Sequence, residues 1–362
     1  MSKHKVVVAM SGGVDSSVTA ALLKEEGYEV VGITMQIWPK GGVERFGGCC
    51  GLEAIEDAKR VANRLGIPHY ILDLREDFQK KVIANFCEEY QKGRTPNPCI
   101  RCNQYIKFDA LLKKAKNVGA DYIATGHYAR IEYDEGQKKY LLKRGIDRKK
   151  DQSYVLYTMS RQQLKHTLMP LGNYTKEKVK QIARKLDLPV ASRPESQEIC
   201  FVPDDDYPNF LQKYLPEAAK PGPIVNKEGE VVGRHQGIIF YTIGQRRGIG
   251  IAAKEPLYVI AIDQESNSVI VGRREDGYSD ELIAKDTNFI GTENANGRIR
   301  AEVKIRYSHK PAWATIIPLR KGKVKVKFDR PQWAITPGQA VVFYDGDTVL
   351  GGGTISAYRR ST

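Results

Sequence analysis

The first part of the chain alternates short apolar runs with longer stretches whose apolar residues recur at helical spacing. The apolar runs predict strands at residues 5–10, 29–38, 69–74 and 122–124. The amphipathic stretches predict helices at residues 18–26, 53–65, 77–90 and 108–116. Strands and helices that alternate in this way form βαβ units, which build a mostly parallel sheet. Ligands of such sheets bind at the carboxyl ends of the strands.

The pattern changes after residue 203. Residues 161–186 still predict two helices, and residues 207–214 predict a further short one. Beyond Pro221-Gly222-Pro223, short alternating runs are broken by Gly, Asn and Asp, as in small barrels or sandwiches. These runs lie at residues 237–242, 257–262, 269–272, 301–306, 323–328 and 339–344.

A chain of 362 residues exceeds one ordinary hydrophobic core, so several domains are expected. We predict an α/β protein with a Rossmann-like parallel-sheet domain and a helical extension at residues 1–205. A small, mainly β domain is predicted at residues 206–280, and a barrel-like β domain at residues 281–362. No run approaches the roughly 18 apolar residues of a membrane helix, and the short apolar start runs into a glycine turn, unlike a signal peptide. These features predict a cytoplasmic protein without a membrane partner.

The charge of the chain is strongly basic and unevenly distributed. Its 57 Lys and Arg residues against 43 Asp and Glu residues give a formal net charge of +14. Residues 298–330 alone carry eleven basic and two acidic residues, a net charge of +9. If this charge were spread evenly, a solvated basic surface without a specific partner would be the simpler explanation. A concentrated patch favours RNA, because neutralised phosphates release their counterions.

The sharpest local pattern is Met10-Ser11-Gly12-Gly13-Val14-Asp15-Ser16-Ser17, which follows the first predicted strand and opens a helix. The two glycines allow a tight turn that presents successive N–H groups, and the serine hydroxyls and the helix N-terminus add to the attraction for an anion. It is not a Walker A loop, because the Lys-Ser/Thr end is missing. A tight turn capped by Asp15 or Ser16 is the simpler alternative.

This loop resembles the pyrophosphatase-type (PP) loop of the adenine nucleotide α-hydrolase-like superfamily. The resemblance implies cleavage of ATP between its α and β phosphates and adenylylation of a carbonyl oxygen, with Asp15 helping to hold Mg²⁺. The residues that it assigns to the nucleotide are Ala9, Met10, Ser11, Gly12, Gly13, Val14, Asp15, Ser16, Met35 and Gly126.

Further motifs are similar to those of the tRNA-specific 2-thiouridylase family. They are GRTPNPCIRCNQYIKF, GHYAR, KDQSYVLY, SRPESQEICFVP, YTIGQRRGIG and RYSH, and the matches run in the family's order from Met10 to His309. That family places sulfur at position 2 of the wobble uridine in certain tRNAs. The resemblance implies an ATP-dependent tRNA sulfurtransferase with an RNA-binding C-terminal domain. It also implies a cysteine desulfurase or a sulfur-relay protein as the sulfur donor.

The resemblance gives Cys102 the role of nucleophile and Cys200 that of the persulfide-bearing cysteine. The persulfide attacks the activated C2 of uridine, and Cys102 resolves the remaining sulfur bond, which leaves a Cys102–Cys200 disulfide. The residues assigned to tRNA are Asn97, Pro98, Cys99, His127, Lys150, Asp151, Gln152, Arg306, Tyr307 and Gln339. Simpler roles are a strand cap for His127, a core position for Tyr307 and a turn for Gln339.

The six cysteines indicate packing, metal binding or redox chemistry rather than a disulfide scaffold. The prolines of Thr95-Pro96-Asn97-Pro98 predict a rigid extended loop around Cys99 and Cys102. Many family members carry Asp at the position of Cys99, where it can serve as an acid or base. Cys99, Cys102 and Cys200 also offer three ligands for a [4Fe–4S] cluster, which would support an iron-dependent version of the same thiolation. Packing is favoured for the remaining cysteines, Cys49, Cys50 and Cys87.

Two other classes of function remain open at this point. The chain could be another PP-loop enzyme that adenylylates a small metabolite or forms an amide, but this leaves its cysteines and basic C-terminus unused. It could also be a non-catalytic RNA-binding protein with a vestigial loop, which the intact SGGVDS string argues against.

Overall fold

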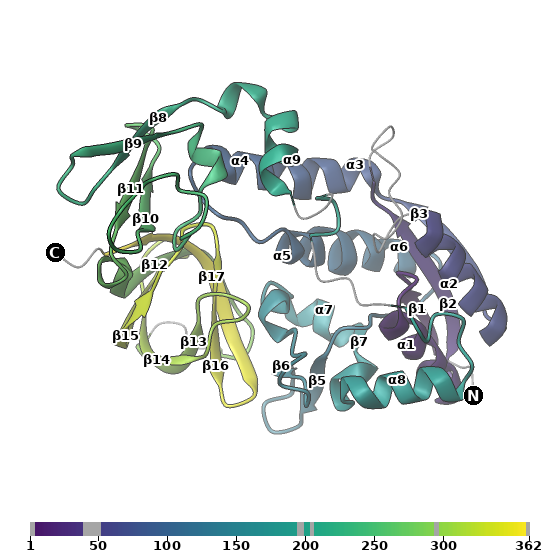
Figure 1. Cartoon of the computed structure of the whole chain (residues 1–362). Coiled ribbons are helices and arrows are strands. Elements are labelled where there is room, and N and C mark those ends of the chain that lie inside the picture. The colour runs from purple at the N-terminus through teal and green to yellow at the C-terminus, as the bar shows by residue number, and fades with distance from the viewer. Residues whose placement is uncertain (1–3, 39–51, 194–198, 203–205, 293–296, 360–362) are drawn as a thin grey trace. The chain divides into compact units, whose positions relative to one another are not determined.

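The computed structural model describes residues 4–38, 52–193, 199–202, 206–292 and 297–359 (Figure 1). The chain divides into two compact units. The first comprises Met1–Ile83, Cys99–Asp205 and Asp347–Val349, and the second comprises Ala84–Pro98, Asp206–Gly346 and Leu350–Thr362. No helix in the described ranges is long and apolar enough to cross a membrane.

A five-stranded sheet forms the centre of the first unit, in the order β3-β2-β1-β4-β7. Every neighbouring pair runs parallel, as predicted. The chain runs outward from β1 to β3 and then returns to the other side of β1, so the strand order reverses between β1 and β4. Ligands bind at such switch points. The strands are β1 (Lys5–Ala9), β2 (Glu29–Gln36), β3 (His69–Asp73), β4 (Tyr122–Ala124) and β7 (Thr167–Leu168).

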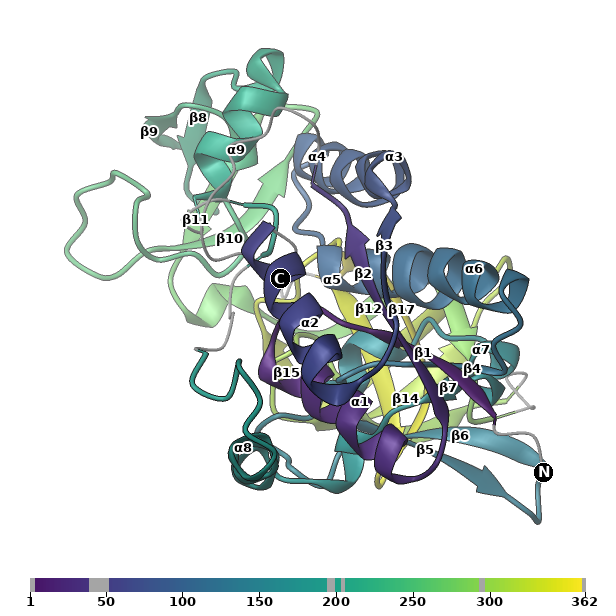
Figure 2. The ribbon, with the colours of Figure 1, turned by 90° about the vertical axis from the view of Figure 1, so that its right-hand side faces the viewer.

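Helices cover both faces of this sheet, since right-handed crossovers on the two sides of a switch point lie on opposite faces (Figure 2). Helices α1 (Val14–Glu25) and α2 (Leu52–Leu65) cover one face, and α6 (Leu111–Asn117) packs on β4. Helix α8 (Lys176–Lys185) packs on α1. The core beneath these helices includes Val6, Val8, Val18, Val61 and Val179.

The segment around Cys99 and Cys102 is helical, so the predicted extended loop is wrong beyond Asn97. Helix α5 (Pro98–Cys102), the π-helical η2 (Asn103–Ala110) and α6 follow one another without a break. Pro98 occupies the first helical position, where its missing N–H and its fixed φ are tolerated. A similar run is formed by α3 (Arg75–Phe78), η1 (Gln79–Ile83) and α4 (Ala84–Gln91).

The rest of the first unit adds a hairpin that was not predicted and the two helices that were. The hairpin is β5 (Ala129–Asp134) and β6 (Lys139–Arg144). The predicted helices are α7 (Arg161–Lys165) and α8, whose N-termini are capped by the hydroxyls of Ser160 and Thr175. The short helices η3 (Ser153–Leu156) and η4 (Pro170–Asn173) complete this part.

The second unit contains a four-stranded sheet in the order β10-β11-β8-β9. The strand predicted at residues 237–242 is wrong, because η7 (Ile238–Phe240) lies there. Its backbone bonds are local: Phe240 N–H donates to the carbonyl of Gly237 at 3.2 Å. A short buried apolar run does not distinguish strand from helix by its spacing. The other elements are α9 (Tyr207–Tyr214), η6 (Pro216–Ala218), β8 (Gly222–Val225), β9 (Val231–His235), β10 (Tyr258–Asp263), β11 (Ser268–Gly272) and η8 (Glu275–Gly277).

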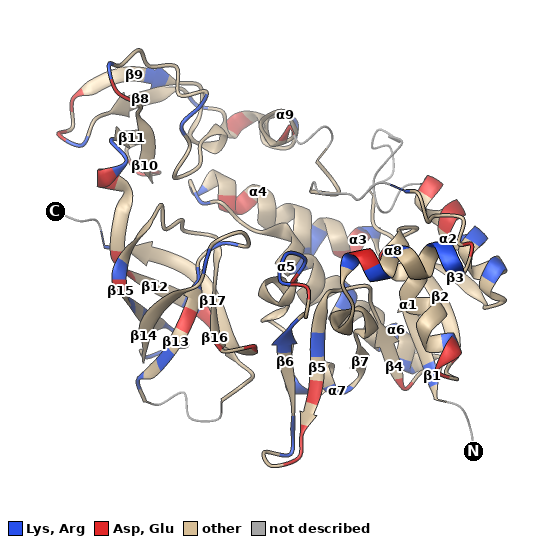
Figure 3. Ribbon diagram, turned by 60° about the horizontal axis from the view of Figure 1, so that its bottom comes forward, with Lys and Arg blue, Asp and Glu red and all other residues tan. Residues whose placement is uncertain are grey.

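A closed barrel completes the second unit, as the short strands predicted. Its strands are β12 (Tyr278–Phe289), β15 (Val324–Trp333), β14 (Ala312–Pro318), β13 (Ile299–Lys304), β16 (Ala340–Asp345) and β17 (Thr348–Tyr358), and a β12–β17 pairing closes it. Val326 and Phe328 point into the barrel core, and Lys325 and Lys327 alternate with them. Figure 3 shows Lys and Arg along β13 and β15.

Candidate functional site

The loop between β1 and α1 lies at the switch point of the parallel sheet. Ser11 N–H donates to Ser16 Oγ at 3.1 Å, and the hydroxyls of Ser16 and Ser17 donate to the Gly13 carbonyl at 3.1 and 2.8 Å. These bonds fold the loop around the first turn of α1. Because α1 has no side-chain cap at Gly13, its first N–H groups keep the positive potential that attracts anions.

Gly12 is required at its position for two reasons. Its φ of +69° lies in the left-handed region. A Cβ atom on Gly12 would also lie 2.4 Å from the carbonyl oxygen of Ala54, in the first turn of α2. The loop is therefore pressed against α2, and the two glycines of the pattern do not have interchangeable roles.

The other residues assigned to the nucleotide lie around this loop. The backbone of Gly126, which follows β4, is so close to α1 that a Cβ would lie 2.9 Å from Ser16 N. Thr34 Oγ1 donates to the Met10 carbonyl at 2.9 Å, which ties the end of β2 to the loop. Met35 follows Thr34 and is buried. The structure thus gathers residues 9–16, Met35 and Gly126, and their contacts with ATP stay a prediction.

Asp15 is held by two residues that the sequence patterns did not indicate. Lys176 Nζ donates to both carboxylate oxygens of Asp15, at 2.7 and 2.8 Å, and Tyr128 Oη donates to Oδ1 at 2.7 Å. Lys176 is only 4% exposed, although Lys178 and Lys185 of the same helix are exposed. Mg²⁺ at Asp15 stays a prediction, and the metal would have to compete with Lys176 for the carboxylate.

Hydrogen bonds also join other motifs of the first unit to this loop. Gln152 Oε1 accepts from the Tyr128 N–H at 3.0 Å, so the KDQSY motif is tied to the GHYAR motif. Arg193, which begins the stretch leading to Cys200, donates to the Gly12 carbonyl at 3.3 Å and pairs with Asp57 of α2. Arg193 therefore lies at the nucleotide loop.

The two cysteines assigned to sulfur transfer belong to the same compact unit. Cys102 is half-buried at the end of α5. The next residue, Asn103, holds this end of the helix in place, because its buried side-chain amide donates to the Val155 carbonyl at 3.1 Å. Cys200 is half-buried, and the next residue, Phe201, packs edge-to-face on Phe78 with ring centroids 5.6 Å apart.

The cysteines do not form a metal site in the part of the chain that the structure describes, where no three His, Cys, Asp or Glu side chains are placed to hold an ion. In the described residues Cys99, Cys102 and Cys200 are therefore not placed as the ligand set of a cluster, and no step is derived through one. Cys49 and Cys50 lie outside the described residues. Cys87 is buried on α4, as expected for packing, and burial raises the pKa of its thiol to about 11.

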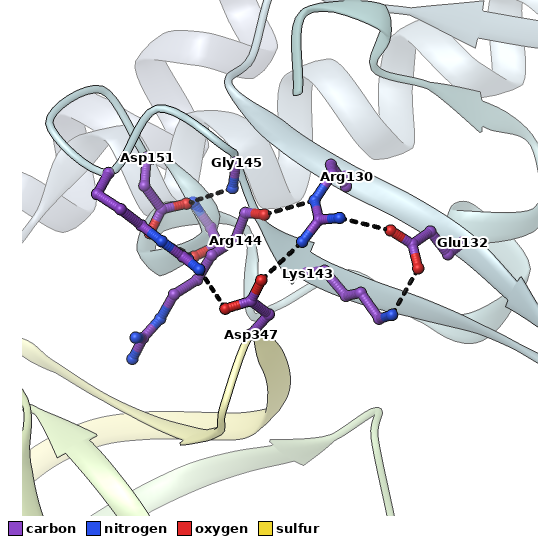
Figure 4. Close-up of polar contacts among 9 residues, drawn as sticks. Arg130, Glu132, Lys143, Arg144, Gly145, Asp151 and Asp347 are labelled. Carbon is purple, nitrogen blue, oxygen red and sulfur yellow. Dashed lines mark hydrogen bonds and ion pairs between the residues drawn. The ribbon is translucent and has the colours of Figure 1, made fainter. Parts of the chain in front are cut away.

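The loop with Lys150, Asp151 and Gln152 is folded by buried polar contacts (Figure 4). Asp151 is buried and accepts from Gly145 N–H at 3.1 Å and from Ser153 Oγ at 3.0 Å. Its carboxylate is thus used within the loop, and contact of these three residues with tRNA stays a prediction.

Asp347 anchors the start of the same loop and the neighbouring hairpin (Figure 4). It accepts from Arg130 at 2.8 Å and pairs with Arg148. Burial alone would raise the pKa of the Asp347 carboxyl, but the hydrogen bond from Arg148 and the charges of both arginines hold it below its usual value. The ion pairs therefore keep Asp347 ionised, and the basic residues of this stretch are partly neutralised.

His127, assigned to tRNA, is buried. The residue is 7% exposed, and its Nδ1 lies 2.8 Å from Thr125 Oγ1. Burial, with a smaller effect from Lys107, lowers the pKa of His127 well below its usual value. The ring is therefore neutral, and a direct contact with RNA would need it to be uncovered.

The residues assigned to tRNA in the second unit divide into two kinds. Gln339 Nε2 donates to the Thr95 carbonyl at 2.8 Å, and Arg306 Nη2 donates to the Ile243 carbonyl at 3.2 Å. Both side chains therefore bond to main-chain carbonyls within the protein. The bond from Gln339 holds the segment that leads to Asn97 and Pro98. Tyr307 is 41% exposed, so the core alternative for it is wrong.

Three family models match consecutive parts of the chain. They are described as a tRNA methyl transferase HUP domain at residues 4–204, a tRNA methyl transferase PRC-barrel domain at 208–273, and an aminomethyltransferase beta-barrel domain at 279–355. Together they cover the parallel-sheet part, the four-stranded sheet and the barrel.

Relatives match over nearly the whole length. The tRNA-specific 2-thiouridylase MnmA of Acetivibrio thermocellus is 56% identical over 98% of this chain and 100% of its own. The enzyme of the same name from Carboxydothermus hydrogenoformans is 58% identical over 98% of both chains, and that of Pelotomaculum thermopropionicum is 55% identical over 99% of this chain and 98% of its own. The motifs, the fold and these relatives agree, and the chain belongs to the tRNA-specific 2-thiouridylase family.

Proposed function

We propose that this protein uses ATP to replace the O2 oxygen of the wobble uridine of tRNA with sulfur. One observation carries the proposal: a chain with full-length relatives named 2-thiouridylases holds the anion-binding loop, Cys102 and Cys200 in one compact unit. The loop supports adenylylation, because backbone N–H groups at a helix N-terminus suit a phosphate chain. Adenylylation converts O2 into part of a good leaving group, AMP, and releases pyrophosphate.

The cysteines support the sulfur transfer. The terminal sulfur of a Cys200 persulfide attacks C2 of the activated uridine, the C2–O2 bond breaks, and AMP leaves with the oxygen. The Cys102 thiolate then attacks Cys200 Sγ, which breaks the sulfur–sulfur bond and leaves the new sulfur on the base. The Cys102–Cys200 disulfide that results is reduced by an external dithiol. Mg²⁺, when bound, would neutralise phosphate charge, and Asp15 is the carboxylate beside the loop that suits it.

The partners follow from this chemistry. The basic barrel supports a role in binding the tRNA backbone, and exposed Tyr307 supports a stacking contact with an unpaired base. A cysteine desulfurase or a relay protein is the proposed source of the persulfide sulfur. We also propose that residues 1–205 form the catalytic domain, 206–280 a connecting domain and 281–362 the RNA-binding domain. A cytoplasmic location is proposed with them.

The test is a thiolation assay on the full-length protein, purified without air and divided into untreated and chelator-treated samples. Each sample receives ATP, Mg²⁺, unmodified tRNA and a desulfurase with cysteine, and the nucleosides are identified by mass spectrometry. We expect 2-thiouridine in both samples. Cys102→Ser and Cys200→Ser should abolish it, and Cys99→Ser should retain it. Cys87→Ala, at a buried thiol away from the loop, is the matched control.

Three other outcomes would contradict parts of the proposal. Activity that is lost on chelation, returns with iron and needs Cys99 would replace the persulfide route by a cluster. Methylated uridine formed with S-adenosylmethionine, as the family models' descriptions would suggest, would replace the reaction itself. ATP cleavage that ignores tRNA would favour a PP-loop ligase that acts on a small molecule.

A further inference from the structure

Lys176 is a buried lysine beside the loop between β1 and α1. It is 4% exposed, and its ammonium group contacts both oxygens of Asp15, which lies 161 positions earlier in the chain. Lysine is almost never fully buried unless it is paired, since burial of a charge is costly. The pairing explains how Lys176 is tolerated, but an apolar residue would fill the same space without that cost.

The chain fixes Lys176 toward the loop from several sides. The Lys176 N–H donates to Asp147 Oδ2 at 3.0 Å, and Thr175 caps the helix that Lys176 begins. The ammonium group lies 5.7 Å from the centre of the Tyr128 ring, and Tyr128 itself donates to Asp15. The lysine is thus held at the nucleotide loop by its own backbone and by a neighbouring aromatic ring.

The loop lacks a cation of its own. The string SGGVDSS contains no Lys or Arg, and Asp15 adds a negative charge where a triphosphate is proposed to bind. Arg193 also contacts the loop at the Gly12 carbonyl, but its charge is paired with Asp57. A Walker A loop solves this problem with a lysine within the loop. Here Lys176, from a helix far along the chain, is a cation that contacts Asp15 of the loop.

We propose that Lys176 is the phosphate-binding cation of the nucleotide site and that it changes partner when ATP binds. In the free protein it neutralises Asp15. When Mg²⁺–ATP enters, Asp15 turns to the metal and Lys176 turns to the phosphates beyond the α position, which leave as pyrophosphate. This inference rests on the proposed use of ATP and adds a residue to it.

The test measures the affinity of the full-length protein for ATP and for AMP by calorimetry, with and without Mg²⁺. AMP lacks the phosphates that Lys176 is proposed to bind, so the ratio of the two affinities isolates its role. We expect Lys176→Met to lower the affinity for ATP by about tenfold or more and the affinity for AMP by less than about twofold. Lys176→Arg should restore part of the lost affinity for ATP. Lys178→Met, at an exposed lysine on the same helix turn, should resemble wild type.

Asp15 provides a second arm of the test. Asp15→Asn should weaken ATP binding only when Mg²⁺ is present, whereas the effect of Lys176→Met should persist without the metal. The double variant Asp15→Asn/Lys176→Met removes both charges of the buried pair. It is used in place of Lys176→Met if that single variant does not fold. It should still show the reduced ratio of ATP to AMP affinity in the absence of Mg²⁺.

Two results would overturn the inference. An unchanged ratio in Lys176→Met, or an equal loss for ATP and AMP, would mean that Lys176 only supports the fold. A wild-type protein that binds no ATP would be a different failure, because it would contradict the proposed function as well.

Discussion

The side-chain amide of Gln339 donates a hydrogen bond of 2.8 Å to the main-chain carbonyl of Thr95, which lies 244 positions earlier. The Thr95 N–H donates in turn to the Pro337 carbonyl at 2.9 Å. Three residues beyond Thr95 the chain enters α5 at Pro98, and α5 carries Cys99 and Cys102. The turn before β16 therefore fixes the entry to the helix that holds the proposed nucleophile.

Removal of this contact should loosen the entry to α5. Gln339→Ala leaves the Thr95 carbonyl without its side-chain donor, and we expect a loss of unfolding free energy of about 1 kcal/mol. Amide hydrogen exchange at Thr95 should become faster, as measured by mass spectrometry. Gln91→Ala, at an exposed glutamine at the end of α4, is the control. Unchanged exchange at Thr95 in Gln339→Ala would show that the amide does not hold the segment.

A methyl group added beside Thr95 should have a larger effect. Gly338 has a φ of +92°, and a Cβ there would lie 2.9 Å from Thr95 N. Gly338→Ala therefore combines backbone strain with a clash, and we expect it to cost more than the roughly 1 kcal/mol typical of strain alone. Gly346→Ala is the comparison, because Gly346 has a φ of +52° and nothing within 4 Å of an added Cβ. Chemical denaturation of both variants measures the difference, and equal losses would argue against the close approach.

The cysteines should differ in their reaction with an alkylating agent. Cys99 is exposed at the start of α5, whereas Cys87 is buried and its thiol has a pKa of about 11. Alkylation requires an accessible thiolate, so at pH 8 iodoacetamide should modify Cys99 rapidly and Cys87 only after denaturation. Peptide mass spectrometry at timed intervals gives both rates. Modification of Cys87 as fast as Cys99 in the folded protein would contradict its burial.

His127 should make the protein sensitive to acid. Its folded pKa lies well below the usual value, so below about pH 6.5 the unfolded chain binds a proton that the folded chain does not. Stability from this group is therefore present above pH 6.5 and falls as the pH decreases, by up to about 1.4 kcal/mol per pH unit.

Denaturation of wild type and His127→Gln between pH 5 and pH 8, a range of about three units around the usual histidine pKa, measures this contribution. The variant should lose less stability on acidification, because the glutamine side chain does not titrate. His4→Gln, at an exposed histidine, is the control. Parallel curves for wild type and His127→Gln would contradict the lowered pKa.

The sequence predicted those parts of the site whose position in the fold is set by residues nearby in the chain. The loop from Ser11 to Ser16 follows a strand and opens a helix, so its turn, its N–H groups and its place at the sheet edge all follow from neighbouring residues. Cys102 was found by resemblance, but its helix was missed because Pro98 signalled an extended chain as strongly as a first helical turn. A proline alone does not distinguish the two.

Residues whose role depends on a distant partner could not be predicted in this way. Lys176 resembles the other lysines of its helix, and only the folded chain brings it to Asp15. Arg306 and Gln339 were assigned to tRNA, yet their donors bond main-chain carbonyls in this structure. Their polarity is visible in the sequence, but the choice between an internal and an external partner is made by packing.

The two compact units do not follow the order of the chain. The first takes Asp347–Val349 from the turn after β16 and the start of β17, and Asp347 accepts hydrogen bonds from Arg130 and Arg148. A ribosome has therefore translated almost the entire message before these arginines can meet their carboxylate. Although domains often fold in order as they emerge, the last contacts of this parallel-sheet unit must wait for the barrel strands. A gene shortened to the first 205 codons would encode a parallel-sheet unit in which Arg130 and Arg148 lack the carboxylate of Asp347.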